Sequence, residues 1–224
     1  MGAPLFASDQ EMFQAMKEKL YAAVLSDALD QVGRRGQAMR ADIRPVYPEA
    51  VVVGRALTVL SVDIYAPVEH PYKLEIESVD LLKPGDVLVA STGRSARTCF
   101  WGELLSTTAR VRGAYGAVID GYTRDVRKIA QMQFPVFAAG MKPVDSAGLG
   151  EVMAYNCPIN CGDVIVHPGD IVFGDIDGVV VIPKEVEKAA IERALQKVEG
   201  ENRTREELLK GGYLRDVYAR YGVL

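Results

Sequence analysis

The sequence predicts an α/β protein with two packed sheets and with helices on the outside. In the middle of the chain, residues 51–139 alternate between apolar β-branched segments and segments with helical spacing. Residues 152–183 then form short apolar runs separated by Gly, Pro and Asp, which is typical of an antiparallel or mixed sheet. Residues 184–224 are highly charged and helical in pattern. Together these observations favour strand–helix–strand units packed on a second β-rich segment.

The N-terminal part of the chain predicts two helices followed by a loop. Residues 9–24 place apolar side chains at helical spacing, which indicates an amphipathic helix. Ser26 is expected to be the N-cap of a second helix that ends at Gly33. Residues 34–48 are rich in Gly, Pro and charge, and we expect a loop there.

The central segments follow in an order that suits strand–helix units. We expect a strand over 51–65 with a bend at Gly54, a short helix over 70–80, a turn over 83–86 and a strand over 87–91.

A helix is expected over 102–113, then a turn, strand and turn over 114–121. A short helix over 124–132 and a strand over 135–139 complete this part. Near the C-terminus, the helical pattern of 184–224 is broken at Gly211 and Gly212. This segment is too polar for a core of its own, so we expect a single domain over 1–224 whose C-terminal arm packs on a neighbouring subunit.

Composition excludes several classes of protein. The 224 residues are 49% hydrophobic and 25% charged, as in ordinary globular proteins, and the net charge of -4 makes nucleic acid an unfavoured partner. We expect no membrane span, and no secretory signal is recognised at the N-terminus. The three cysteines, Cys99, Cys157 and Cys161, suggest no disulfide framework, which favours a cytoplasmic location.

Residue types also exclude most catalytic machineries. The only histidines are His70 and His167, too few for a multi-histidine zinc site, and His70 is the better functional candidate of the two although a structural role is the commoner one. No nucleophile elbow or P-loop is present, and the glycine-containing segment 113–118 precedes a strand, whereas a dinucleotide-binding loop follows one. Every lysine lies in a polar, helical or turn segment, which disfavours a Schiff-base lysine and leaves a metal as the route to carbanion chemistry.

Two segments remain as candidate sites. In VIDGYTRD (118–125) an apolar strand leads into Asp120, then Arg124 and Asp125 stand at the start of a short helix, where functional residues of α/β proteins are common. The alternative is that the two carboxylates cap turns and that Arg124 forms an ion pair.

In FWGELL (100–105), Gly102 allows close approach of a ligand. The amides of Glu103, Leu104 and Leu105 are then free donors for a carboxylate or phosphate. A plain helix start with an acidic first turn explains this second segment equally well.

The segment GELLSTTARVRGAYGAVIDGYTRD (102–125) resembles the signature of the 4-hydroxy-4-methyl-2-oxoglutarate aldolases and of the related regulators of ribonuclease E activity. The resemblance extends over nearly the whole chain, including LSDALDQVGRRGQ (25–37) and CGDVIVHPGDIVFGDIDGVVVIP (161–183). It implies an α-β-β-α sandwich, swivelling-domain-like, with N-terminal helices and a C-terminal helical arm. It also implies a homotrimer or a homohexamer with sites between subunits.

The resemblance implies a role for each residue of the two segments. Asp125 would hold a divalent metal, Mg²⁺ or Mn²⁺, largely through water, and Arg124 would contact substrate oxygens. The amides of Gly102 through Leu105 would hold a pyruvate-like carboxylate, and Glu103 would order water near the leaving oxygen. A glutamate from the arm of the adjacent subunit would complete the site; Glu201 is our assignment, with Glu199 as the alternative.

The implied function is a class II lyase that cleaves a 4-hydroxy-2-oxo acid to pyruvate and a second oxo acid, with oxaloacetate decarboxylation as a side activity. One alternative is a non-catalytic regulator of ribonuclease activity, which typically lacks the Asp that is present here as Asp125. Another is a lyase for a different hydroxy or sugar acid. Arg94 and Arg97 could bind a second substrate carboxylate, or could be solvated loop residues.

Overall fold

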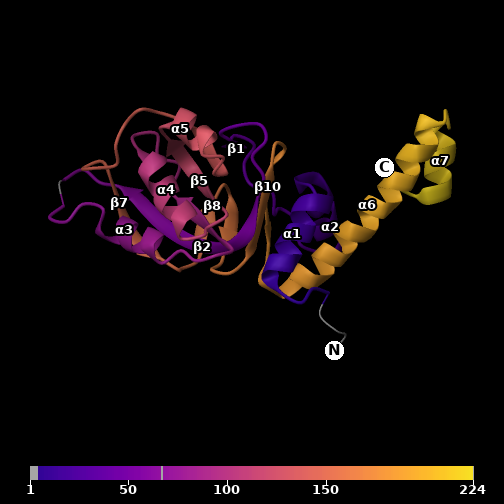
Figure 1. Cartoon of the computed structure of the whole chain (residues 1–224), viewed down its shortest axis with the longest axis horizontal. Helices are drawn as coiled ribbons and strands as arrows, with labels where there is room; N and C mark the ends of the chain where they lie inside the picture. The colour runs from indigo at the N-terminus through magenta and orange to yellow at the C-terminus, as the bar shows by residue number, and fades with distance from the viewer. Residues whose placement is uncertain (1–4, 67, 224) are drawn as a thin grey trace.

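A mixed α/β fold built on one strongly curved sheet is present in the computed structural model, which describes residues 5–66 and 68–223 (Figure 1). The order of the main path is β1-β6-β5-β3-β2-β10-β11, with β4 beside β5 and β7 beside β2. Strands β2 to β6 pair in parallel, whereas β1, β7, β10 and β11 join antiparallel. The nine strands are β1 (Arg44–Pro45), β2 (Val52–Asp63), β3 (Asp86–Ser91), β4 (Cys99–Trp101), β5 (Gly116–Thr123), β6 (Val136–Met141), β7 (Gly150–Tyr155), β10 (Ile171–Asp175) and β11 (Gly178–Ile182).

The two ends of this sheet come together, so that it is nearly closed like a barrel. Residues just before β1 bond to β11, with Met39 N donating to Val179 O at 2.8 Å and Val181 N donating to Gln37 O at 2.9 Å. The guanidinium of Arg44 donates to the carbonyl of Asp177 in the β10–β11 turn. A barrel protects its sheet edges from further pairing.

The expected division into two packed sheets is therefore only partly right. Strand β2 is long enough to pair with β10, β3 and β7 in succession, and this joins both halves of the β structure into one sheet. Among the described residues, only the hairpin of β8 (Ile159–Cys161) and β9 (Val164–Val166) stands apart, as a separate two-stranded sheet.

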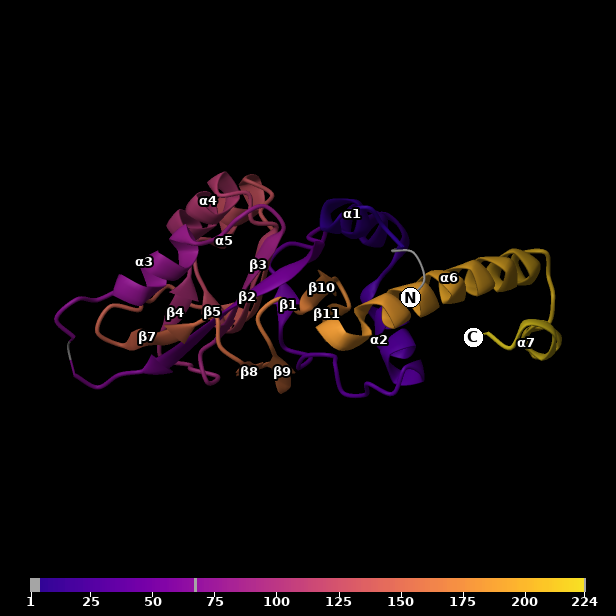
Figure 2. The ribbon, with the colours of Figure 1, turned by 90° about the horizontal axis from the view of Figure 1, so that it is seen from below.

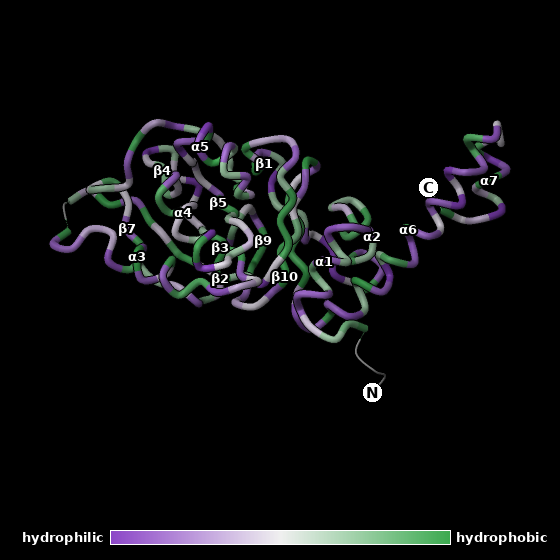
Figure 3. Tube along the Cα trace, viewed as in Figure 1, coloured by the Kyte–Doolittle hydropathy of each residue, from purple (hydrophilic) through white to green (hydrophobic). Residues whose placement is uncertain are grey.

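Helices cover the sheet on two sides. Helices α3 (Lys73–Asp80), α4 (Glu103–Val111) and α5 (Val126–Gln131) lie together on one face, on the opposite side from β8 and β9 (Figure 2). Elsewhere α1 (Asp9–Lys19), α2 (Ala22–Gln31) and the first half of α6 (Glu187–Leu209) pack against β10 and β11. Each layer buries its own apolar cluster, and hydrophobic residues are dense along β10 between the two parts (Figure 3).

Several expected element boundaries are corrected. The helix expected over 9–24 is interrupted at Leu20 and Tyr21, which have extended backbone, so Ser26 lies inside α2 and is not an N-cap. Gly33 does follow the end of α2, with φ of +80°. The turn expected at the end of 114–121 is absent, because β5 continues to Thr123, and β4 was not predicted.

The C-terminal arm is helical, as expected, and its second half projects away from the body (Figures 1 and 2). Its first half is held to α2 by Lys197, whose Nζ lies 2.6 Å from Asp27 Oδ2, and by the hydroxyl of Tyr21, which donates to Glu201. After Gly211 and Gly212 the chain reverses into α7 (Leu214–Tyr221). Packing of the arm on a neighbouring subunit, and the single domain over 1–224, stay predictions. Among the described residues, no helix is both long and apolar enough to cross a membrane.

Candidate functional site

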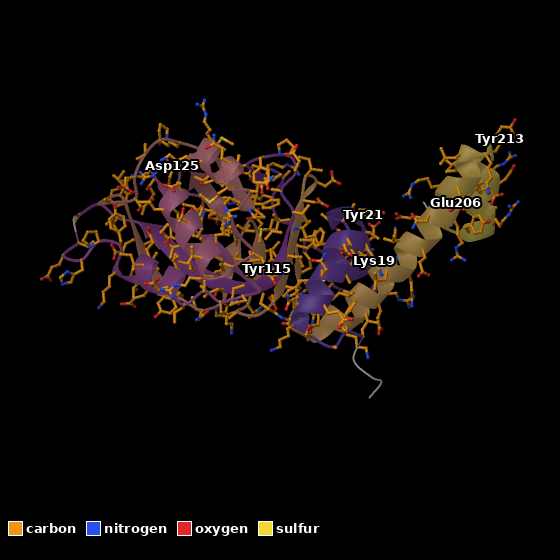
Figure 4. All side chains as sticks on the ribbon, viewed as in Figure 1. Lys19, Tyr21, Tyr115, Asp125, Glu206 and Tyr213 are labelled. Atoms are coloured by element: carbon orange, nitrogen blue, oxygen red, sulfur yellow. The ribbon has the colours of Figure 1, made fainter. Side chains whose placement is uncertain are left out.

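The two candidate segments meet because the strands that precede them are neighbours. Strand β4 pairs in parallel with the end of β5, so residues that follow each strand emerge at the same edge. The backbone N–H of Arg124 donates to Trp101 O at 3.0 Å, and the hydroxyl of Thr123 donates to the same carbonyl at 3.0 Å. Asp125 therefore lies in the body of the molecule, well away from the arm (Figure 4).

The Asp125 side chain makes a hydrogen bond at the start of α4, the helix that follows β4. Helix α4 has Gly102 at its N-cap, which offers no side chain, and the Asp125 carboxylate instead accepts from Glu103 N at 3.2 Å. A Cβ added to Gly102 would lie 2.9 Å from Asp125 Oδ2 and 3.3 Å from Arg124 Cγ. Asp125 itself has φ of +60°, in the left-handed region that few non-glycine residues adopt. Such a conformation is common at functional sites.

This contact refines the predicted carboxylate site. The amide of Glu103 is engaged by Asp125, so the amides of Leu104 and Leu105 remain as the first-turn donors for a ligand. Ser106 N already donates to Gly102 O, which places it within the helix. The structure thus brings together the predicted residues from Gly102 to Leu105 with both members of the Arg–Asp pair.

Arg124 lies between two carboxylates. Its Nε is 3.7 Å from Asp125 Oδ2, and its Nη2 is 3.4 Å from Asp145 Oδ1. The Arg124 side chain is 37% exposed, so the guanidinium is fixed yet accessible to a ligand. Glu103 is nearby on α4, where it accepts from Thr107 Oγ1 at 3.2 Å and lies 3.9 Å from Lys128 Nζ.

A pocket of about 350 Å³ lies over these residues, and part of its wall was not predicted. Glu75 comes from α3 and Tyr72 is the N-cap residue directly before it, whereas Asp145 and Ser146 come from the loop between β6 and β7. The Tyr72 hydroxyl donates to Asp145 Oδ2 at 2.8 Å. The positive φ of Tyr72, +67°, is the unusual feature of this wall, and it is not visible in the sequence.

Burial changes the ionisation of this wall. Glu75 is only 8% exposed, and burial, with the nearby charge of Asp145, raises its pKa to about 7. Burial and the hydrogen bond to Asp145 raise the pKa of Tyr72 to about 12. Burial opposes ionisation of Asp145, but the bonds from Tyr72 and Ser146 and the charge of Arg124 outweigh it and lower the pKa. Burial also raises the pKa of the Cys99 thiol, which disfavours a thiolate nucleophile.

Several other candidates lie elsewhere. Glu201 accepts from Tyr21 and lies 3.8 Å from Lys197, on the arm side of the molecule, and burial raises the pKa of its carboxyl. Contact between Glu201, or Glu199, and the site of another subunit stays a prediction. His70 is exposed and 3.9 Å from Glu69, and it does not line the pocket.

The residues present suit a largely hydrated magnesium ion. No group of three or more His, Cys, Asp or Glu is placed to hold a metal within residues 5–66 and 68–223. The Asp125 side chain is 44% exposed, so one hard carboxylate is available to an ion that keeps most of its waters. Mg²⁺ is commonly held in this way, by one or two carboxylates together with water and substrate oxygens.

Comparisons with known proteins identify the family. The model of the RraA-like family, described as Aldolase/RraA, matches residues 22–181. An uncharacterised protein of Methanocaldococcus jannaschii is 48% identical over 124 residues, which are 54% of this chain and 57% of that protein. A protein of Halalkalibacterium halodurans, provisionally named 4-hydroxy-4-methyl-2-oxoglutarate aldolase, is 34% identical over 177 residues, 77% of each chain.

A solved structure has the same fold over nearly the whole chain. It is RraAS2 of Streptomyces coelicolor, called an unusual member of the RNase ES inhibitor RraA family. Its TM-score is 0.78 at 25% identity, and the match covers 90% of this chain and 99% of that one. The N-terminal helices and the long C-terminal helix are therefore included in the likeness.

Proposed function

The chain belongs to the RraA-like family of aldolases and RraA proteins, and from this premise we propose that it is a divalent-metal-dependent, class II lyase. The reaction is cleavage of a 4-hydroxy-2-oxo acid to pyruvate and a second oxo acid. The observation that carries the proposal is the contact of Asp125 with the N-terminus of α4, directly beside the accessible guanidinium of Arg124. A carboxylate for a metal, a fixed cation and free amides thus face one pocket.

Each residue of the site has a role that its chemistry supports. The amides of Leu104 and Leu105 bind the substrate carboxylate at the helix N-terminus. Arg124 offsets the negative charge that develops on the 2-oxo oxygen. A divalent cation held at Asp125 would supply Lewis-acid stabilisation of the enolate left by cleavage.

Proton transfers complete the reaction. Glu103, acting through an ordered water, accepts the proton of the 4-hydroxyl as the C3–C4 bond breaks. The bond electrons form the enolate of pyruvate, and the second fragment leaves as an oxo acid. Protonation at C3 then gives pyruvate. Oxaloacetate loses carbon dioxide to the same enolate, so decarboxylation is an expected side activity.

The proposal includes an assembly with sites between subunits. We propose a homotrimer or homohexamer in which Glu201 of one chain reaches the site of the next. The exposed apolar residues near the end of the arm, Leu209 and Tyr213, support a contact with another chain. The substrate is a small 2-oxo acid.

A non-catalytic regulator is the second candidate, because RraAS2 shares the fold and is named as an inhibitor-family member. In that case the Asp125 and Arg124 pair would be a helix cap only. Metal dependence of a reaction separates the two candidates.

The experiment measures pyruvate release from oxaloacetate and from 4-hydroxy-4-methyl-2-oxoglutarate with Mg²⁺, with EDTA and with Asp125→Asn. We expect turnover that is abolished by EDTA and reduced at least 100-fold by Asp125→Asn. Asp30→Asn, a half-exposed carboxylate on α2, is the matched control and should behave as the wild type. Turnover that is unchanged in Asp125→Asn would refute the proposed role of the site.

A further inference from the structure

The charged side chains that line the pocket over Arg124 and Asp125 are mostly acidic. Among the described residues that line it, Arg124 is the only one with a permanent positive charge. Beyond Arg124, the polar part of the wall includes Tyr72, Glu75 and Asp145. This wall presents carboxyl and hydroxyl oxygens to whatever part of the substrate lies beyond the reacting carbons.

The arginines that could have bound a second carboxylate are engaged elsewhere. Arg94 forms an ion pair with Asp163. Arg97 donates to Ile64 O at 3.0 Å and lies over the ring of Tyr65, 4.2 Å from its centre. Neither arginine lines the pocket.

We propose that Tyr72, Glu75 and Asp145 select a substrate whose distal part carries neutral hydroxyl groups and no second carboxylate. The substrate class is a monocarboxylic, polyhydroxylated 4-hydroxy-2-oxo acid, of the sugar-acid type. This inference rests on the proposed lyase function and specifies its substrate; with such a substrate the fragment released beside pyruvate is a hydroxylated aldehyde in place of the second oxo acid.

Electrostatics favours this class. The Arg124 charge already faces Asp125 and Asp145, at 3.7 and 3.4 Å, before any substrate carboxylate is added. Among the described lining residues of this chain, a second carboxylate would lie against Asp145 and Glu75 with no cation beyond Arg124. Like charges in close contact repel, and they repel more strongly in a partly buried pocket than in water.

Hydrogen bonding favours the same class. Substrate hydroxyls can donate to Asp145 or to the Tyr72 oxygen, whose own proton is donated to Asp145, and they can accept from the protonated form of Glu75. A site built to bond substrate hydroxyls rejects analogues without them strongly, because its buried polar groups are left unpaired. The volume of about 350 Å³ is at the small end for ligand sites and suits an acid of this size.

The test compares two substrates on the full-length protein in its native assembly with Mg²⁺. One is 2-dehydro-3-deoxygluconate, with a neutral hydroxylated tail, and the other is 4-hydroxy-4-methyl-2-oxoglutarate, with a second carboxylate. We expect kcat/KM for pyruvate release to be at least tenfold higher for the first. A preference for the dicarboxylate would overturn the inference and leave the lyase function intact. Turnover of neither compound, nor of oxaloacetate, would overturn both.

Variants show whether the acidic wall is the cause. Asp145→Asn and Glu75→Gln should each raise KM for the hydroxylated acid about tenfold, with a smaller change in kcat. Both variants should also raise kcat/KM for the dicarboxylate. The ratio of the two kcat/KM values should therefore fall to about one. Glu77→Gln, on the same helix and outside the pocket lining, is the control. An equal loss on both substrates would mean a merely structural role and would overturn the inference.

Discussion

At the scale of single residues, the absence of a side chain at Gly102 matters as much as the charges around it. The backbone there passes so close to the Arg124 and Asp125 side chains that a Cβ would lie 2.9 Å from Asp125 Oδ2. The φ of Gly102 is −157°, which any residue adopts, so the constraint is space and not backbone strain. Small displacements of catalytic groups are costly, because catalysis depends on alignment to within a fraction of an ångström.

We predict that Gly102→Ala lowers kcat/KM for pyruvate release about 100-fold, since it displaces the Asp125 carboxylate from the α4 terminus. Steady-state kinetics and urea unfolding measure activity and stability in parallel. Thr108→Ala, a partly buried position on the same helix outside the pocket lining, is the control and should keep its activity. Wild-type activity in Gly102→Ala would show that the close approach has no role in the reaction.

A second prediction at this scale concerns Glu75, whose ionisation makes the stability of the protein depend on pH. Its folded pKa of about 7 lies above the ordinary value of 4.5, mainly because of burial, and Asp145 and Glu151 add to the effect while Ser146 and Arg124 oppose it. The folded state therefore binds more protons than the unfolded state between these two values. Its contribution to stability is fully present below pH 4.5 and is lost as pH rises toward 7.

The change in the free energy of unfolding caused by Glu75→Gln should consequently be more favourable to the folded state at pH 8 than at pH 5. The upper limit of the difference is about 3 kcal/mol, from the size of the pKa shift. Urea unfolding at both pH values measures it, with Glu77→Gln as the control. A pH-independent effect of Glu75→Gln would show that Glu75 ionises normally in the folded protein.

At the scale of elements, Arg55 on β2 connects the sheet to two helices. Its guanidinium pairs with Asp9 at the start of α1, with Nε 2.8 Å from Oδ2, and with Glu187 at the start of α6. The Arg55 side chain is 20% exposed, and the bond to Asp9, with that to Glu187, raises its pKa further above the ordinary value. Three segments far apart in the sequence are joined at this one side chain.

Arg55→Ala should lower the free energy of unfolding by roughly 2 kcal/mol, less than for a fully buried pair because Asp9 is half exposed. Arg34→Ala removes a well-exposed pair with Glu185 and should cost below about 0.5 kcal/mol. Denaturant unfolding of the two variants gives the comparison. Equal losses would mean that Arg55 contributes no more than a surface ion pair.

At the scale of the whole molecule, the candidate site and the arm lie at opposite ends (Figure 4). Asp125 is in the sheet-bearing body, whereas Glu206 and Tyr213 lie at the far end of the arm. Glu201 contacts Tyr21 within its own chain and so does not reach its own Asp125. If Glu201 acts in catalysis, it acts in the site of another subunit.

Mixing two inactive variants tests this arrangement. We predict that Asp125→Asn and Glu201→Gln are each inactive alone, and that co-refolded mixed oligomers regain about a quarter of wild-type activity, since random assembly restores one site in four. Light scattering on the same samples gives the number of subunits. Recovery of no activity, with oligomers formed, would exclude Glu201 as a residue shared between subunits.

The sequence by itself determined the features that depend on neighbours along the chain. Periodicity predicted most helices and strands, and the motif from Gly102 to Asp125 predicted the residues that meet at the α4 terminus. These predictions succeeded because both segments directly follow paired strands, so local order along the chain carries over into space. The prediction of Ser26 as an N-cap was wrong, because the local preference of serine for caps is weak compared with the packing of α2 on the sheet.

Only the tertiary structure decided what depends on distant pairings. The long β2 joins the β structure into one nearly closed sheet, and no local pattern in its sequence indicates three partner strands. The pocket wall of Tyr72, Glu75 and Asp145 likewise forms only when α3 and the β6–β7 loop pack beside α4. Burial and long-range charge, which raise the pKa of Glu75, are properties of that packing and not of the residue. For this reason the residues proposed to bind the reacting end of a substrate could be predicted from the sequence, whereas those proposed to face its distal end required the fold.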